Sequence, residues 1–306
     1  MIALIETNSK PGDRDININN TVANSIKFIF DELTENKIPD ARLNAELFLC
    51  HVLNCDRVSL YLNFDKPLKP DETDILNKFI KRRIIHEPLQ YILGKTSFYG
   101  YDINVNKSVL IPRPETELLV ERILRDIEDK QKVFVSIFEV GTGSGCIPIA
   151  IAKSLIKNEI PFEIFSIDIS ASAIKTANEN LELNGLKIPG IRLAEKDVFE
   201  IDKLKKDFDY IISNPPYISN DEYELLDKDV LESEPKIALT DSADGLNFYK
   251  RIFKIASDKG FTGKMYLETG FGQKEDLEKL LKENNFTEYV FHKDYNDIHR
   301  ILEVAK

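Results

Sequence analysis

The second half of the chain alternates between short apolar runs and amphipathic segments, and this alternation limits the possible folds more than any other feature. Helical segments such as 170–184 separate most of the apolar runs. Strands connected through helices predict an α/β fold with a parallel, doubly wound, Rossmann-like sheet. The last two runs are too close for a crossover helix, so we expect them to pair as an antiparallel hairpin at one end of the sheet. The expected strands are 133–139, 162–168, 191–196, 208–213, 264–268, 287–292 and 298–304.

The first part of the chain has a different pattern. Between residues 21 and 85 the apolar positions recur at helical spacing, which predicts a small helical bundle. Residues 1–20 are polar and are expected to form a tail. Beyond the bundle, Tyr91, Ile92 and Phe98 are strand formers with glycines nearby, which favours a β-hairpin. The predicted organisation is a tail (1–20), a helical bundle (21–85), a hairpin connector (86–112) and an α/β domain (113–306).

Composition and charge narrow the class of protein. The 306 residues are 42% hydrophobic, enough for a sizeable core, and no apolar run approaches the ~18 residues that span a bilayer. The net charge of −11 disfavours binding to duplex nucleic acid through its phosphates. Three cysteines and four scattered histidines offer neither a disulfide framework nor the spacing of a metal site. We therefore expect a cytoplasmic protein with no resident metal, no membrane contact and no direct nucleic-acid partner.

A glycine-rich turn follows the first expected strand of the sheet and opens a helix. It consists of Gly141, Thr142, Gly143, Ser144 and Gly145. Glycines let the backbone approach a ligand, and the unpaired N–H groups of a helix start face that ligand. A dinucleotide fingerprint needs its third glycine one position later, where Cys146 stands. The tighter spacing suits a ligand without a pyrophosphate, namely S-adenosylmethionine; a purely structural turn is the alternative.

Acidic residues end the next two expected strands. Asp168 lies where a carboxylate can accept hydrogen bonds from two ribose hydroxyls, although it also fits the start of a helix as a cap. Asp197, Val198 and Phe199 follow the third strand, where an acid could hold an adenine amino group and an apolar side chain could cover the ring. A solvated loop acid is the alternative for Asp197. These residues are candidate cofactor contacts.

The tetrapeptide Asn214-Pro215-Pro216-Tyr217 follows the strand expected at 208–213. Open α/β sheets keep their chemistry at the carboxyl ends of such strands. The prolines restrict the backbone before them, which fixes the direction of the Asn214 side chain. The Asn214 oxygen and the Pro215 carbonyl can accept the two N–H bonds of a substrate NH₂ group, next to the cofactor, and Tyr217 can stack on that planar group. A rigid proline turn without chemistry is the alternative.

Longer motifs extend this pattern. The Asn-Pro-Pro-Tyr tetrapeptide is similar to that of methyltransferases that act on adenine, cytosine or glutamine nitrogen. Together with it, five segments resemble the peptide chain release factor glutamine methyltransferase family. These segments are Pro-Leu-Gln-Tyr-Ile at 88–92, Val-Leu-Ile-Pro-Arg-Pro-Glu-Thr-Glu at 109–117, Glu-Pro-Lys-Ile-Ala-Leu at 234–239, Asp-Gly-Leu-Asn-Phe-Tyr at 244–249 and Leu-Glu-Thr-Gly at 267–270. The resemblance covers nearly everything from Thr21 onward.

The resemblance implies a class I methyltransferase fold and N5-methylation of the glutamine in the Gly-Gly-Gln loop of class I peptide chain release factors. It implies that residues 141–145 and Asp168 bind S-adenosylmethionine and that residues 214–217 bind the glutamine. The family usually has aspartate at the position of Glu139, and some members place an aromatic cofactor contact at the position of Val198. The helical bundle carries no chemical motif, and we expect it to dock the protein substrate.

Three other functions fit parts of the pattern. A glutamine methyltransferase acting on a ribosomal protein shares the tetrapeptide and much of the fold. An adenine-N6 DNA methyltransferase is expected to have a basic surface for a flipped base, which the charge of −11 does not favour. A cofactor-binding protein without catalysis has no need for the intact Asn214 side chain.

Overall fold

The computed structural model describes residues 21–204, 206–257 and 261–305. The tail expected at 1–20 lies outside the described residues. The described chain divides into two compact units, which join in sequence between Leu93 and Gly94. No helix in these three ranges is both long and apolar enough to cross a membrane.

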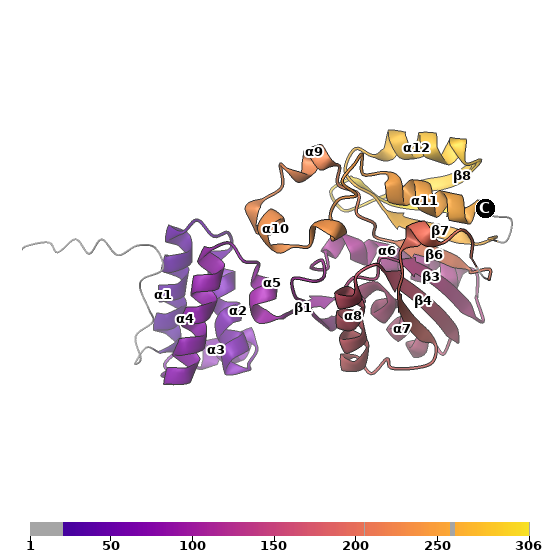
Figure 1. Cartoon of the computed structure of the whole chain (residues 1–306). Coiled ribbons are helices and arrows are strands. Elements are labelled where there is room, and N and C mark those ends of the chain that lie inside the picture. The colour runs from indigo at the N-terminus through magenta and orange to yellow at the C-terminus, as the bar shows by residue number, and fades with distance from the viewer. Residues whose placement is uncertain (1–20, 205, 258–260, 306) are drawn as a thin grey trace, which may run out of the picture. The chain divides into compact units, whose positions relative to one another are not determined.

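The second unit is built on a seven-stranded sheet (Figure 1). Its strands are β3 (Val135–Val140), β4 (Phe162–Asp168), β5 (Ile191–Glu195), β6 (Tyr210–Ser213), β7 (Lys264–Glu268), β8 (Glu288–Lys293) and β9 (His299–Ala305). They lie in the order β5-β4-β3-β6-β7-β9-β8. The first five in that order pair in parallel, and β9 pairs antiparallel with both β7 and β8. The predicted doubly wound sheet with an antiparallel terminal hairpin is confirmed.

Two predicted strands begin two residues earlier than the observed ones, for identifiable reasons. Val133 is a strand former, but it is 86% exposed and precedes β3. Phe208 and Asp209 precede β6, and the Asp209 carboxylate accepts hydrogen bonds from the Ser136 backbone N–H and hydroxyl at 2.8 Å each. This side-chain contact joins the start of β6 to β3 without a strand pair at that position.

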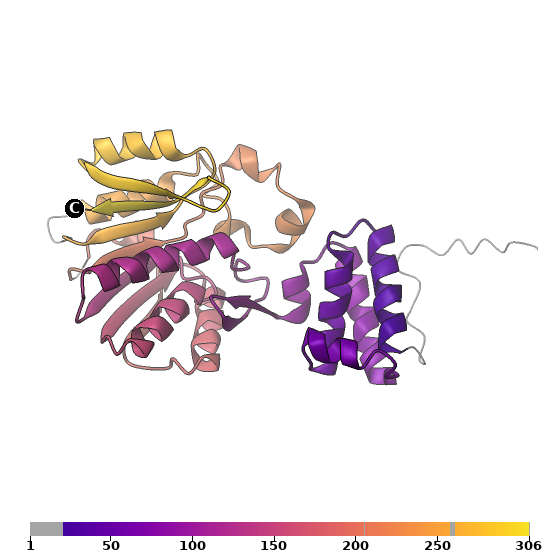
Figure 2. The ribbon, with the colours of Figure 1, turned by 180° about the vertical axis from the view of Figure 1, so that it is seen from behind.

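Helices cover both faces of the sheet. Neighbouring helices α6 (Pro114–Asp129), α7 (Cys146–Lys157) and α8 (Ala171–Leu183) lie on one face, and α11 (Asn247–Ala256) and α12 (Lys274–Glu283) lie on the other (Figures 1 and 2). Because side chains alternate along a strand, β3 divides its residues between the two faces. Phe138 and Val140 join the core cluster that contains Tyr249 of α11 and Leu277 of α12. The side chain of Glu139 consequently faces the layer of α6, α7 and α8.

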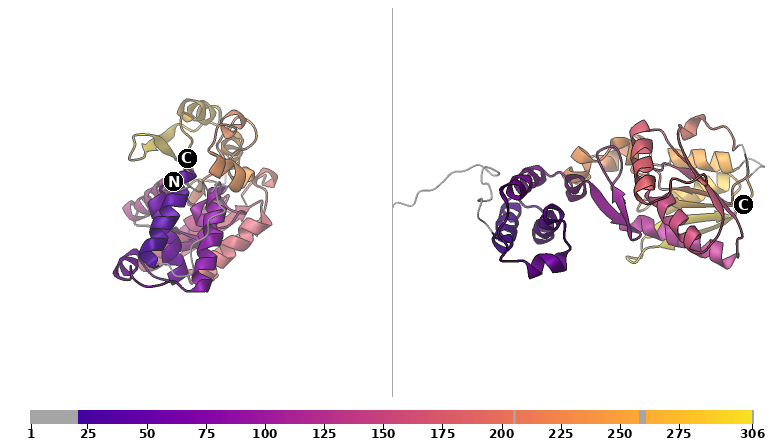
Figure 3. Two further views of the ribbon diagram at one scale, coloured as in Figure 1. Left: turned by 90° about the vertical axis from the view of Figure 1, so that its left-hand side faces the viewer. Right: turned by 90° about the horizontal axis from the view of Figure 1, so that it is seen from below.

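The described part of the first unit, from residue 21, contains five helices, shown from two further sides in Figure 3. They are α1 (Val22–Glu35), α2 (Ala41–Leu53), α3 (Arg57–Leu62), α4 (Pro70–Ile84) and α5 (Leu89–Leu93). The Thr21 hydroxyl caps α1 by accepting the backbone N–H of Asn24 at 3.3 Å. The apolar stripes meet in one core that includes Ile29, Phe48 and Ile80. The helical bundle predicted from spacing is therefore present.

The predicted hairpin is present but is shorter than its strand-forming residues indicated. Strands β1 (Lys95–Phe98) and β2 (Tyr101–Asn104) pair antiparallel. Tyr91 and Ile92 were expected to be strand residues, and this was wrong, because both lie in α5. Their apolar side chains are buried, which a short helix achieves as well as a strand.

A single side chain of α8 holds the hairpin and the glycine-rich turn together. Asn180 accepts the Asn104 backbone N–H at 2.7 Å and donates to the Asn104 carbonyl at 2.9 Å. It also donates to the Ser144 carbonyl at 2.8 Å. Asn180 is fully buried. If its side chain were removed, water could not reach these backbone groups to satisfy their hydrogen bonds.

Replacing Asn180 with alanine should destabilise the protein by about 2–4 kcal/mol, since several buried polar groups lose their partner together. Urea unfolding followed by circular dichroism measures the change. Asn178→Ala is the matched control, because Asn178 lies on the same helix, is exposed and bonds only within it. Equal stability of the two variants would show that the Asn180 bonds contribute nothing.

Candidate active site

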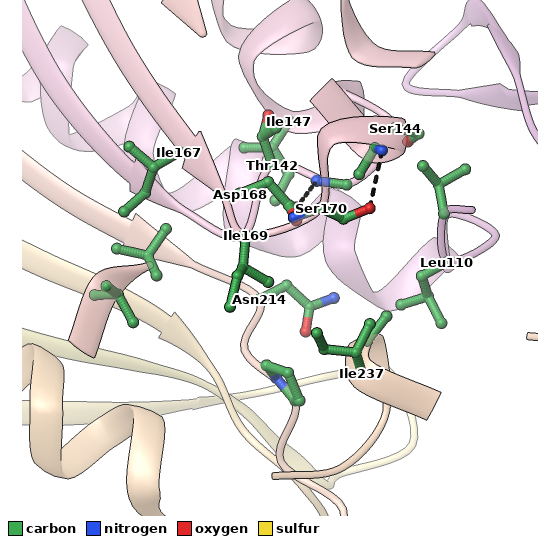
Figure 4. Close-up of a pocket in the computed structure, with 18 of the residues that line it drawn as sticks. Leu110, Thr142, Ser144, Ile147, Ile167, Asp168, Ile169, Ser170, Asn214 and Ile237 are labelled. Atoms are coloured by element: carbon green, nitrogen blue, oxygen red, sulfur yellow. Dashed lines mark hydrogen bonds between the residues drawn. The ribbon is translucent and has the colours of Figure 1, made fainter. Parts of the chain in front are cut away.

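A cavity opens at the carboxyl ends of β3, β4 and β6 (Figure 4). Parallel strands end at the same edge of a sheet, so the segments that follow these three strands meet there. The predicted site residues that line the cavity are Gly141, Thr142, Gly143, Ser144, Asp168, Asp197, Val198, Phe199, Asn214 and Pro216. Gly145, Pro215 and Tyr217 are not part of the lining.

The glycine-rich turn forms the floor of the cavity and leads into α7. All three of its glycines have positive φ angles, which residues with a side chain rarely adopt. A Cβ atom at Gly143 would have no heavy atom within 4 Å, so this glycine leaves open space beside the backbone. A Cβ atom at Gly145 would lie 3.1 Å from the Cβ of Ala177. Gly145 therefore allows α7 to pack against α8, whereas Gly143 faces the cavity.

Asp168 at the end of β4 is fixed by backbone N–H groups. One carboxylate oxygen accepts the N–H of Gly143 and the other accepts the N–H of Ser170, each at 2.9 Å. Burial is the main cause that raises the pKa of Asp168, and these N–H groups oppose it. The helix-cap role that the sequence allowed belongs instead to Ser170, whose hydroxyl accepts the Ala173 N–H at the start of α8. The Asp168 carboxylate is thus anchored to the turn while it faces the cavity.

A short 3-10 helix, η1 (Val198–Glu200), forms another part of the wall. The Asp197 carboxylate accepts the Phe199 N–H at 2.8 Å and so caps this helix. Val198 is buried, whereas the Phe199 side chain is 45% exposed. The Phe199 ring meets that of Phe248 edge-on, with 5.2 Å between centroids, and both line the cavity. This wall presents apolar surface with one carboxylate beside it.

Asn214 lies directly after β6. Its Nδ2 donates to the hydroxyl of Thr116 at 3.1 Å, and Thr116 lines the same cavity from the first turn of α6. The Asn214 Oδ1 accepts no hydrogen bond from any described residue. Figure 4 shows the Asn214 amide between Ile169 and Ile237. An acceptor is therefore available on the cavity side of this residue.

Pro215 and Tyr217 lie beside the cavity. Pro215 is buried. The Tyr217 hydroxyl donates to Glu268 at 3.4 Å, and its ring packs against the core cluster on the side of α11. The Tyr217 ring thus lies outside the cavity lining, and its stacking on a substrate amide stays a prediction.

Two segments without a role assigned from their residues complete the cavity. Residues 108–110 and 112–113 line one side, and Ile237 and Ala238 of η2 (Lys236–Ala238) line another. The carboxylate of Glu234 accepts hydrogen bonds from the Arg113 guanidinium at 2.5 Å and from the Ile111 N–H at 3.4 Å. These bonds join the segment before α6 to the segment before η2. Both lie in motifs that carry the family resemblance, but their separation by 121 residues hides this contact from any local pattern.

Matches to known families and proteins cover both units. Residues 26–94 match the family described as the PrmC N-terminal domain, and residues 114–235 match the methyltransferase small domain. A release factor glutamine methyltransferase of Fusobacterium nucleatum is 39% identical over 281 residues, which cover 90% of this chain and 76% of that protein. A release factor glutamine methyltransferase of Geobacter sulfurreducens is 38% identical, covering 88% of this chain and 91% of that protein.

The chain belongs to the release factor glutamine methyltransferase family. Solved structures agree on the fold. The catalytic domain of hMettl16 superposes with a TM-score of 0.53 at 15% identity, covering 74% of this chain and 80% of that chain. The N-terminal domain of human METTL16 gives a TM-score of 0.51, also at 15% identity, over 74% of this chain and 81% of that chain. The resemblance seen in the motifs is confirmed at the level of the family.

Glu139 is fully buried near the end of β3. It is paired in register with Ser166 of β4. The hydroxyls of Ser166 and Thr142 are near its carboxyl but make no hydrogen bond of ordinary geometry with it. Desolvation is the main cause that raises the pKa of Glu139 to about 7. An ionised Glu139 therefore destabilises the ligand-free fold.

Stability should depend on this carboxyl between pH 4.5 and 7. Because the pKa is raised in the folded protein, the stabilisation is complete below about pH 4.5 and is lost as the pH rises to about 7. The rise from 4.5 to about 7 corresponds to roughly 3 kcal/mol. Glu139→Gln cannot ionise, so its stability relative to wild type should increase from pH 5 to pH 8.

Urea unfolding at several pH values measures this difference. Carboxyls that do not interact with Glu139 contribute equally in both proteins, so their contributions cancel. Glu288→Gln, which changes an exposed carboxylate on β8, is the matched control. A difference in stability between Glu139→Gln and wild type that does not change with pH would show that Glu139 does not titrate in this range.

Proposed function

We propose that the protein transfers the methyl group of S-adenosylmethionine to the side-chain amide nitrogen of the glutamine in the Gly-Gly-Gln loop of class I peptide chain release factors. The observation that carries this proposal is the unpaired Oδ1 of Asn214 at the edge of the cavity. An amide NH₂ group needs an acceptor of this kind to be held by its N–H bonds. The names of the relatives support the release factor as the protein that carries this glutamine.

The residues present fit S-adenosylmethionine. Open space beside Gly143 accommodates a ligand against the backbone of the turn. The Asp168 carboxylate, anchored through backbone N–H groups, retains lone pairs for ribose hydroxyls. We assign the ribose to Asp168 and the adenine to the wall formed by Asp197, Val198 and Phe199.

Bound S-adenosylmethionine supplies an electrophilic methyl group at a sulfonium centre. The task of the protein is then to orient a weak nucleophile, because the lone pair of an amide nitrogen is delocalised into its carbonyl group. Asn214 Oδ1 accepts one N–H of the glutamine amide, and the Pro215 carbonyl accepts the other. With both N–H bonds held, the nitrogen is directed at the methyl group, and orientation of this kind lowers the barrier substantially. The nitrogen then loses a proton to solvent.

The apolar parts of the wall exclude water from the site. Ile169, Ile237 and Phe248 line the cavity beside Asn214 and Asp168. Hydrogen bonds to the amide are stronger where water is absent, because the local dielectric constant is lower. The site therefore combines a small number of polar groups with a largely apolar wall, as small-molecule sites commonly do.

We further propose that the helical unit docks the release factor. None of its residues from 21 to 93 lines the cavity, and it matches a domain family of its own. Deuterium exchange of the enzyme with and without intact release factor tests this role. Unchanged exchange throughout α1 to α5 would exclude docking by these helices.

The direct test of the function is mass spectrometry of a purified class I release factor after incubation with the enzyme and S-adenosylmethionine. The loop glutamine should gain one methyl group. Ribosomal proteins from the same cells serve as the competing substrate. A methyl group found on a ribosomal-protein glutamine and absent from the release factor would support the alternative member of this reaction class.

Two variants should separate the proposed roles of Asn214 and Asp168. Asn214→Ala removes one acceptor of the target amide, so kcat should fall by about 10²-fold or more, as for one preorganised hydrogen bond. Its affinity for S-adenosylhomocysteine should change by less than about tenfold, or ~1.4 kcal/mol. Asp168→Ala should weaken that affinity by about 1–3 kcal/mol.

Turnover and calorimetric affinity are measured on the same folded preparations. Full turnover of Asn214→Ala would make the tetrapeptide a structural turn. Loss of cofactor affinity in Asn214→Ala together with turnover would place Asn214 mainly in the cofactor site. Unchanged affinity of Asp168→Ala would remove Asp168 from that site.

A further inference from the structure

A chain of hydrogen bonds runs from Asn214 into the protein interior. Asn214 Nδ2 donates to the Thr116 hydroxyl at 3.1 Å, and that hydroxyl donates to Glu268 Oε2 at 2.7 Å. The Tyr217 hydroxyl donates to the other oxygen, Glu268 Oε1, at 3.4 Å. The chain joins residues from α6, the end of β7 and the segment after β6. Thr116 and Glu268 are each almost fully buried, at 2% and 1% exposure.

The chemistry of these groups allows only one direction for the Asn214 amide. An ionised carboxylate accepts hydrogen bonds and donates none, so Glu268 requires the single hydroxyl proton of Thr116. Thr116 can then offer Asn214 only a lone pair. The NH₂ group of Asn214 must face Thr116, because the reversed amide would bring two acceptor oxygens together. Oδ1 is thereby directed away from Thr116, to the side where a substrate can use it.

The surroundings of Glu268 determine the pH range in which its carboxyl is ionised. Burial is the main cause that raises the pKa of Glu268 to about 7, and the Thr116 hydroxyl, Arg300 and the Tyr217 hydroxyl oppose it. Glu115 adds to the rise. The backbone carbonyl of Glu268 accepts the Tyr249 hydroxyl at 2.7 Å, which holds the end of β7 in place. At pH 8 the carboxylate is ionised and can only accept.

We propose that Thr116 and Glu268 are positioning residues that fix the orientation of the Asn214 side-chain amide and so present its oxygen to the substrate NH₂ group. The proposal rests on the proposed function, since it specifies how the acceptor at that site is oriented. Neither residue touches the reacting atoms. The contribution of Thr116 to turnover passes through Asn214.

The experiment compares Thr116→Val, which has no hydroxyl, with Thr116→Ser, which keeps it. Both are assayed at pH 8 for methyl transfer to the release factor and for S-adenosylhomocysteine binding. Thr116→Val should lower kcat by about tenfold or more, because Asn214 loses the partner that orients it. Thr116→Ser should stay within about threefold of wild type, and cofactor affinity should change by less than about threefold in both.

Thr176 of α8 provides a matched control. It is also a buried threonine that accepts an asparagine NH₂ group, that of Asn106 at 3.0 Å, and donates to the Ser172 carbonyl at 3.1 Å. Thr176→Val should therefore lose similar stability and keep its kcat. A fall in kcat for Thr116→Val no larger than that for Thr176→Val overturns the proposal, and so does a Thr116→Ser variant as slow as Thr116→Val.

A double variant separates positioning from an independent effect. If Thr116 acts only through Asn214, then Thr116→Val should cause little further loss of kcat in the Asn214→Ala background. A full additional tenfold loss there contradicts the proposal.

Nuclear magnetic resonance tests the orientation without reference to the substrate. In protein labelled with ¹⁵N at asparagine, the Asn214 side-chain NH₂ signals, assigned through Asn214→Asp, should exchange slowly with solvent in wild type and Thr116→Ser. They should exchange faster in Thr116→Val. Equal exchange in all three overturns the proposal. If the wild-type protein does not methylate the release factor, the proposed function is refuted. The exchange rates of the Asn214 NH₂ signals then still test whether Thr116 orients the Asn214 amide.

Discussion

The pairing of β3 with β4 and β6 is the constraint on which the site depends. These strands are parallel, and Val140 is in register with Ile167 on one side and Ser213 on the other. The three strands therefore end within one residue of the same level, and the chain leaves the sheet at three adjacent points. The glycine-rich turn directly follows β3, Asn214 directly follows β6, and Asp168 is the last residue of β4. A cavity with a backbone floor, a carboxylate and an amide follows from this register before any loop contributes.

The sheet sets the positions of the site residues, and contacts outside the sheet orient their side chains. Asn214 reaches its partner Thr116 because α6 packs near the end of β7, where Glu268 completes the hydrogen-bond chain. The Arg113–Glu234 ion pair in turn joins the segment before α6 to the segment after β6. Thr116, Glu234 and Glu268 are buried and depend on their partners, since a buried polar group that loses its partner is left unsatisfied. The rigidity of the site thus resides in contacts between distant motifs.

Sequence patterns were sufficient for the sheet, because it rests on local periodicity, and short motifs identified ten of the residues that line the cavity. The strand at 162–168 was predicted at its observed bounds, and so was the strand at 264–268. Tyr91 and Ile92 were misassigned since a short apolar run fits a buried helix as well as a strand. The bond between Thr116 and Glu268 spans 152 residues, and no spacing rule connects residues so far apart. Thr116 and Glu268 each lie in a motif that carries the family resemblance, but neither motif indicates that the two residues are in contact.

The position of β9 has a consequence for how the fold is completed. β9 lies between β7 and β8, although β8 comes before it in the chain. Until β9 inserts, both β7 and β8 present an open edge, and open edges recruit strands of other molecules. Every side chain that lines the cavity comes earlier in sequence than β7. The strands that close this side of the sheet therefore supply no side chain to the cavity lining, and their contribution is to cover edges that would otherwise be open to other chains.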